Sequence, residues 1–238
     1  MGSLTALLLA TPIFGFSLQA PALEAQVDLS AKTVVDVAML AKVDDDKESS
    51  GSGNPSAEDQ YKKDLKLRND IAGVHRIFGI STWVAMTLTL IAGGIDYHNL
   101  YGFGADIGSN PCVTGSAAFG DDFGCRGGIR TVKSVAAYVT TALYATTFTL
   151  SLMMPDPDDL SSGKGEFAST LRLHKTLRWV HFAGMCLQII GGVLIASRVG
   201  GLDRANDYGT LQALATVHMG VGLVTWGALS WAGALMTF

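Results

Sequence analysis

Four long stretches of the chain lack charged residues and consist mainly of apolar side chains. Each is long enough to cross a hydrocarbon layer about 30 Å thick, which takes about 20 helical residues. Because a bilayer offers the backbone no hydrogen-bonding partner, a spanning segment must satisfy its own amides, as an α-helix does. The uncharged stretches are residues 77–95, 134–154, 179–197 and 211–238. With their flanks they predict transmembrane helices at about 71–95, 131–154, 170–198 and 210–237.

The pattern predicts an all-α integral membrane protein, a four-helix up-down bundle over residues 68–238 with a polar N-terminal tail. Segment 4–22 is apolar and is followed by small residues, as in a signal peptide, although no basic residue precedes it. We interpret residues 1–25 as a signal peptide or a short membrane segment. Residues 26–67 are expected to be a polar, partly disordered tail that becomes basic and helical from Tyr61.

The composition agrees with a membrane protein, since 48% of the residues are hydrophobic and only 16% are charged. The net charge of −4 comes with no basic stripe, so nucleic acid is not an expected partner, whereas membrane lipid is. No segment resembles a nucleophile–base pair, a phosphate-binding loop or a zinc signature. Whether the chain is an enzyme stays open, but an electron-transfer subunit is favoured over a stand-alone enzyme.

Lysine and arginine are unevenly divided between the two membrane faces, and the richer face is cytoplasmic by the positive-inside rule. A cleaved signal peptide would instead put that face outside, so we leave the orientation open. The poorer face also carries Cys112 and Cys125, which could form a disulfide in an oxidising compartment. The richer face holds Lys62, Lys63, Lys66, Arg68, Arg76, Lys164, Arg172, Lys175 and Arg178, and the other holds Arg126, Arg130, Lys133, Arg198 and Arg204.

Two histidines lie at the start of predicted membrane helices, His75 in VHRIFG and His181 in WVHFAGMC. Ionisable residues inside a membrane are costly and are candidates for function by default. A weak internal repeat aligns LKLRNDIAGVH (65–75) with LRLHKTLRWVH (171–181), so the two histidines are equivalent. On parallel helices they would lie at similar depth. They are therefore candidate axial ligands of one haem b iron, as neutral imidazoles.

Neighbouring residues could complete such a cofactor site. Gly79 and Gly184 each lie one helical turn deeper than a histidine and would leave room for a macrocycle edge. Arg178, like Lys175 and Arg172, could pair with haem propionates or could be an ordinary membrane-edge cation. His174 lies on the face of His181 and could be the ligand in its place, but it is the less favoured of the two because it lies outside the uncharged stretch.

Two further histidines allow a second haem, which would use His218 in ATVHMGVG and His98 in DYHN. Their predicted depths differ by about 10 Å, so one haem is favoured and two are possible. His218 could alternatively bind the first haem or a quinone. The second helix has no histidine but carries a polar line, Thr140, Tyr144, Thr147 and Ser151, which we expect to face the bundle core.

Residues 68–238 resemble the transmembrane b-type cytochromes, both the ascorbate-reducible family and the cytochrome b subunits of bacterial respiratory enzymes. The resemblance lies in VHRIFG, LRWVHFAGMCLQIIGG and ATVHMGVG. It implies haem b in the bundle, electron exchange with a quinone or a redox partner protein, and an integral protein of the bacterial inner membrane. The two-haem pattern has a histidine in the second helix, but the second helix of this sequence has none.

We therefore expect a membrane electron-transfer protein with bis-histidine haem b. A haem-free structural or assembly subunit of a larger membrane complex is the alternative, in which the long loop and the N-terminal tail contact other subunits. A transporter is less favoured, because no acidic residue lies inside the uncharged stretches.

Overall fold

A computed structural model describes residues 56–197 and 201–236, which form helices and no strand. The predicted signal peptide or short membrane segment, and most of the predicted tail, lie outside these residues. Four of the helices are long and apolar enough to cross a membrane, which confirms the all-α four-helix prediction. The elements are α2 (Ala57–Tyr101), α3 (Pro111–Thr114), the π-helical turn η1 (Asp121–Cys125), α4 (Gly128–Met153), α5 (Glu166–Ser197) and α6 (Tyr208–Ala234).

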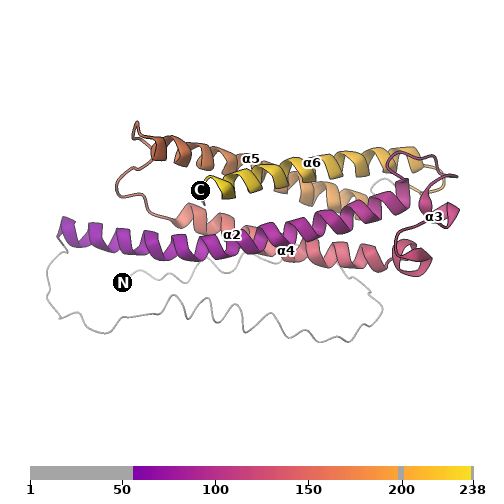
Figure 1. The fold of residues 1–238 in the computed structure, drawn as a ribbon, viewed down its shortest axis with the longest axis horizontal. Coiled ribbons are helices and arrows are strands. Elements are labelled where there is room, and N and C mark those ends of the chain that lie inside the picture. The colour runs from indigo at the N-terminus through magenta and orange to yellow at the C-terminus, as the bar shows by residue number, and fades with distance from the viewer. Residues whose placement is uncertain (1–55, 198–200, 237–238) are drawn as a thin grey trace, which may run out of the picture. The chain divides into compact units, whose positions relative to one another are not determined.

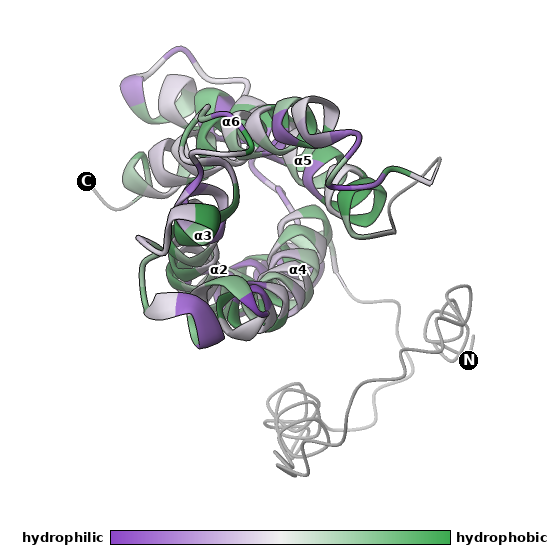
Figure 2. Cartoon of the chain, turned by 90° about the vertical axis from the view of Figure 1, so that its right-hand side faces the viewer, coloured by the Kyte–Doolittle hydropathy of each residue, from purple (hydrophilic) through white to green (hydrophobic). Residues whose placement is uncertain are grey.

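The four long helices form two antiparallel hairpins. α2 packs along α4, α5 packs along α6, and α2 also contacts α6, whereas α4 and α5 make few contacts. Figure 1 shows α2 and α5 running in one direction and α4 and α6 returning. Viewed along the bundle, α5 and α6 lie side by side on one side of it, and α2 and α4 lie on the other (Figure 2). We call the end where α2 and α5 begin the basic end, and the opposite end the cap end.

The first long helix extends beyond its predicted bounds at both ends. α2 begins at Ala57, where the Ser56 side chain accepts a hydrogen bond from the Asp59 N–H and caps the helix. Pairs one turn apart support this polar extension, such as the Lys62–Glu58 ion pair. The last part of the segment predicted to be a tail is therefore helical, because good helix-forming residues propagate the membrane helix outward.

Apolar side chains fill the centre of the bundle, with one from each long helix in the middle layer: Met86, Tyr144, Met185 and Leu229. The predicted polar line on α4 also faces inward, since Thr140, Tyr144 and Thr147 are all buried. The Thr140 hydroxyl lies 3.0 Å from that of Thr89, and the Thr147 hydroxyl 3.0 Å from that of Thr82. These hydroxyl pairs join α2 to α4, as expected between helices in a membrane.

The outer surface of the bundle carries many large apolar side chains. Large aliphatic side chains on α2 are exposed, and they recur every three or four residues along one face. An apolar surface this continuous suits lipid rather than water. The stripe consists of Ile77, Ile80, Val84, Leu88 and Ile91.

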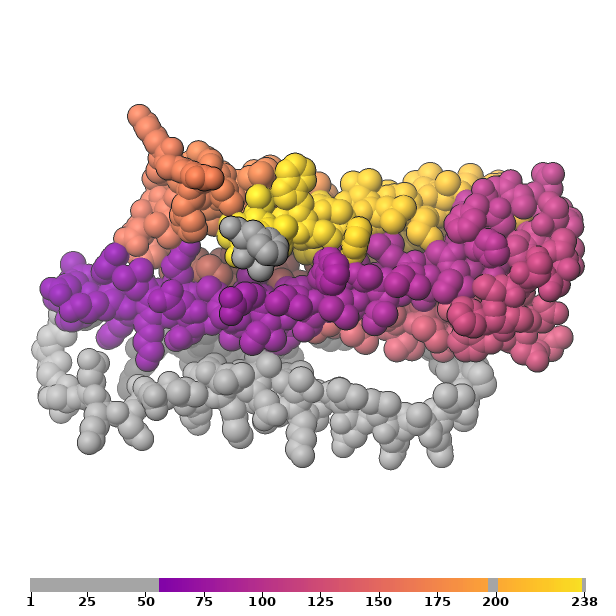
Figure 3. All heavy atoms as spheres, viewed as in Figure 1, coloured from indigo at the N-terminus to yellow at the C-terminus, as the bar shows by residue number. Residues whose placement is uncertain are grey.

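A folded loop between α2 and α4 closes the cap end (Figure 3). A disulfide joins Cys112 to Cys125, the pair that the sequence suggested. Asn99, which is fully buried, binds this loop to the end of α2. Its side-chain amide donates to the carbonyls of Ala118 and Gly124, and its oxygen accepts from the Ala118 N–H at 2.8 Å.

We predict that Asn99→Ala loosens the folded loop at the cap end while the membrane helices stay assembled. The substitution leaves buried backbone groups without partners, which costs about 1–3 kcal/mol each. Hydrogen exchange in residues 110–127 should become faster, whereas exchange in α4 and α6 stays unchanged. Asn69→Ala, on the exposed part of α2, is the control and should leave the loop protected. Unchanged exchange in the loop of the Asn99 variant would contradict the role of this side chain.

Candidate functional site

The structure brings His75 of α2 close to His174 of α5. Their ring centroids are 6.5 Å apart and the ring planes are nearly perpendicular, at 84°. The two helices belong to different hairpins and do not pack directly on each other. Metal–imidazole bonds are about 2 Å long, so two rings that share one metal ion have centroids about 6 Å apart. The separation of these two rings therefore fits a pair of axial ligands.

The hydrogen bonds of this pair leave the same ring nitrogen available on both residues. His75 Nδ1 lies 3.1 Å from the Thr147 carbonyl oxygen, and His174 Nδ1 lies 2.9 Å from the Ala232 carbonyl oxygen. A carbonyl only accepts hydrogen bonds, so each Nδ1 carries the proton and each Nε2 keeps its lone pair. A backbone carbonyl that orients the other ring nitrogen is the usual arrangement around a metal-bound histidine.

His181 is in a different environment. It is buried, and its Nδ1 lies 2.8 Å from the hydroxyl oxygen of Tyr144 on α4. Either the Tyr144 O–H or the His181 Nδ1–H is the donor of this hydrogen bond, depending on the tautomer of the imidazole. The ring of His181 packs against Tyr144, whereas the ring of His75 contacts His174, so the structure favours His174 over His181 as the partner of His75.

The cations proposed for the propionates are used in different ways. Arg172 and Lys175 already contact the loop between α4 and α5. The Arg178 NH1 group donates to the Ser151 carbonyl, and the guanidinium lies over the Trp179 ring. Within the described part of the chain, the buried Arg178 Nε–H has no hydrogen-bond partner. Arg178 is thus the cation whose free donor best suits a carboxylate on a cofactor.

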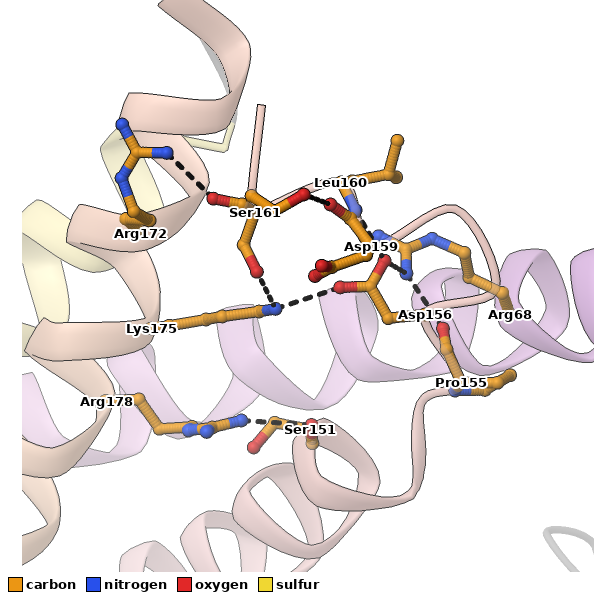
Figure 4. A network of polar contacts seen from close by, with 11 residues as sticks. Arg68, Ser151, Pro155, Asp156, Asp159, Leu160, Ser161, Arg172, Lys175 and Arg178 are labelled. Atoms are coloured by element: carbon orange, nitrogen blue, oxygen red, sulfur yellow. Dashed lines mark hydrogen bonds and ion pairs between the residues drawn. The ribbon is translucent and has the colours of Figure 1, made fainter. Parts of the chain in front are cut away.

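Asp156 links the two helices that carry the histidine pair. One oxygen of its carboxylate accepts from Arg68 of α2 and from the Leu160 N–H, both at 3.1 Å, and the other accepts from Lys175 of α5 at 3.0 Å (Figure 4). Burial favours a higher pKa for Asp156, but the Lys175 and Leu160 hydrogen bonds and the charges of Lys175 and Arg68 outweigh it. The pKa therefore lies below its ordinary value. The network holds α2 and α5 together at the basic end.

We predict that Asp156→Asn destabilises the protein at neutral pH by about 2 kcal/mol, since it weakens charge-assisted hydrogen bonds. The folded pKa lies below the unfolded one, so this stabilisation is complete above about pH 4 and is lost as the pH falls through and below that value. Thermal unfolding in detergent at several pH values should show the two proteins converging in acid. Asp159→Asn, which removes the same charge from an exposed side chain, should match the wild type throughout. A constant difference between Asp156→Asn and wild type down to low pH would contradict this account.

The two glycines predicted to make room for a cofactor lie against neighbouring helices. A Cβ at Gly184 would stand only 2.1 Å from the Thr225 hydroxyl oxygen on α6, so α5 and α6 use this space for close packing. A Cβ at Gly79 would meet Thr147 on α4 at an ordinary 3.8 Å. The room at Gly184 that the sequence analysis gave to a macrocycle is therefore filled by Thr225.

His218 and His98 have separate surroundings at the cap end. Gly191 packs against His218, with its ideal Cβ 2.9 Å from His218 Nδ1. The His98 ring lies 5.3 Å from the Phe103 ring, and its Nδ1 lies 3.3 Å from the Asn99 side-chain oxygen. Among the described residues no contact joins the two rings. The second haem remains a prediction from sequence.

Sequence reasoning missed two charged groups that pair across the bundle. Asp96 lies one residue beyond the first uncharged stretch, yet it is buried within α2 and forms an ion pair with Lys133 of α4. The Asp156 network was also missed, because a carboxylate in a Pro- and Asp-rich loop is normally expected to be exposed to solvent. In both cases the only signal was an acidic residue next to a membrane helix.

No protein-family model matches the chain, and no curated protein or solved structure shows significant similarity to it.

Proposed function

We propose that the protein is a membrane electron-transfer protein that holds one haem b between His75 and His174. The observation that carries this proposal is the pair of rings 6.5 Å apart, from two hairpins, with each Nδ1 held by a backbone carbonyl. When bound, haem b would supply a carrier of one electron at a time. This pair replaces His75 and His181, the pair that the internal repeat suggested.

The residues around the pair would serve to orient it and to balance charge. The Thr147 and Ala232 carbonyls fix the orientations of the rings and make each imidazole a more basic, stronger metal ligand. Arg178 would neutralise a propionate through its free Nε–H, and the Asp156 network would keep α2 and α5 at a fixed distance. Since both axial positions would be filled by protein, the site suits electron exchange rather than turnover of a substrate at the iron.

The partner and the location follow from the same proposal. A site within a transmembrane bundle suits a lipid-soluble donor such as a quinol, or a redox partner protein that docks at one end. The resemblance of VHRIFG and LRWVHFAGMCLQIIGG to bacterial respiratory cytochrome b subunits supports the bacterial inner membrane as the location.

An absorption spectrum of the purified protein tests this function. The reduced-minus-oxidised difference should show the sharp α and Soret bands of low-spin haem b, and a soluble quinol should produce the reduced form without dithionite. The proposal would be overturned if the purified protein lacked these bands although the cells were grown with ample haem. That result would favour the alternative, a haem-free structural or assembly subunit that contacts other proteins through its cap.

A further inference from the structure

A basic pocket lies at the surface of α5, beside the loop that follows α4. It has a volume of about 660 Å³, and its lining includes Ser161, Arg172, Lys175, Arg178, Trp179 and Val180. The three cations recur every three residues along α5. Figure 4 shows Lys175 extending from α5 towards the loop, with Arg172 hydrogen-bonded to Ser161 above it and Arg178 reaching Ser151 of α4 below it. The pocket is large enough for a polar group the size of a lipid headgroup.

Two of these cations keep hydrogen-bond donors available for a ligand. The contacts of Arg172 with the carbonyls of Ser161 and Gly163 use only NH1, although a guanidinium has five N–H donors. Lys175 donates to Asp156 and to the Ser161 hydroxyl, which uses two of its three protons. Asp156 is shared between Lys175 and Arg68, so it neutralises only part of the local positive charge.

The lining of the pocket also includes two exposed apolar side chains of α5. Trp179 is 52% exposed and Val180 is 47% exposed, and both lie where the uncharged stretch of α5 begins. Tryptophan is enriched where a membrane helix meets the headgroup layer. The pocket therefore combines cations at headgroup level with an apolar surface that continues into the membrane. Basic pockets of this kind bind anionic headgroups.

We infer that this pocket binds the phosphate of an anionic phospholipid. Arg172 and Lys175 hold the phosphate oxygens, and the acyl chains lie along Trp179 and Val180. Guanidinium groups bind phosphate with two parallel hydrogen bonds, which favours Arg172 as the main contact. The inference does not depend on haem, because Arg178 and not Arg172 or Lys175 is the cation assigned to a propionate. Lys175 also belongs to the Asp156 network, which joins α2 to α5 with or without haem.

Native mass spectrometry of the full-length protein in detergent tests this site. The protein is titrated with phosphatidylglycerol or with phosphatidylcholine, and the bound lipid is counted by mass. Wild type should retain one phosphatidylglycerol in preference to phosphatidylcholine. Arg172→Gln should weaken this binding about five- to tenfold, Arg172→Lys should weaken it less, and Lys66→Gln, at the same end but outside the pocket, should leave it unchanged.

Three results would overturn the inference. Equal retention of the two lipids would remove the preference for negative charge. An unchanged preference in Arg172→Gln, with the variant folded as judged by circular dichroism, would place the lipid elsewhere. If inorganic phosphate alone occupied the pocket and displaced the lipid at comparable concentration, the ligand would be a soluble anion. Because the readout is mass, a haem-free protein that still binds phosphatidylglycerol would leave this inference intact.

Discussion

His174→Ala and His75→Ala should each abolish the low-spin haem b spectrum, whereas His181→Ala should keep it. Each of the first two substitutions removes a ring whose Nε2 lone pair is free to bind iron. The third removes a buried ring that is hydrogen-bonded to Tyr144, so it should lower stability without removing a ligand. The measurement is the reduced-minus-oxidised spectrum of each purified variant at equal protein concentration.

Two controls make this comparison decisive. Added imidazole should restore part of the spectrum of His174→Gly, because it can occupy the space left by the missing ring. His98→Ala should retain the full spectrum, since that ring lies at the cap end beside Phe103. Loss of the spectrum in His181→Ala, with retention in His174→Ala, would reverse the assignment and restore the pair that the repeat suggested.

Gly184→Ala should destabilise the bundle by about 1–3 kcal/mol, the usual effect of overpacking a close contact. The added methyl would stand 2.1 Å from the Thr225 hydroxyl oxygen and 3.0 Å from its Cβ, and Thr225 is only 2% exposed, so either its side chain or the two helices must shift. Thermal unfolding in detergent gives the change in stability. Protein that still folds should retain the haem spectrum, because the space at Gly184 serves the packing of α5 on α6.

Two further variants separate packing from other effects. Gly79→Ala is the matched control, since its methyl meets Thr147 only at 3.8 Å and should be tolerated. Thr225→Ala in the Gly184→Ala background removes the nearest atom and should recover much of the lost stability. Strict additivity of the two substitutions would contradict direct contact between these residues.

The helices were predictable from sequence because membrane spans depend on length and on the absence of charge. The inward polar line of α4 was also predictable, since hydroxyls spaced by three and four residues share one helix face. The polar start of α2 was predicted only from Tyr61, and its first turn from Ala57 was missed, because polar helix-forming residues outside a membrane resemble solvated chain.

The choice among the histidines could not be made from sequence. The repeat aligned His75 with His181, but the packed hairpins bring His75 to His174, which lies seven residues or about 10 Å earlier on α5. The register of one helix against another is determined by contacts between them, such as the packing of the Thr225 side chain of α6 on Gly184 of α5. Such contacts cannot be read from one helix alone. The tautomers depend in turn on that register, because the Thr147 and Ala232 carbonyls come from α4 and α6.

The haem-to-protein ratio of the purified wild-type protein tests the central claim most directly. Haem extracted as its pyridine complex and compared with protein from quantitative amino-acid analysis gives this ratio. One haem b per chain is the result we predict from the single pair His75 and His174. A ratio near zero, in protein made with ample haem, would contradict the proposal, and a ratio of two would require a second site that this pair does not supply.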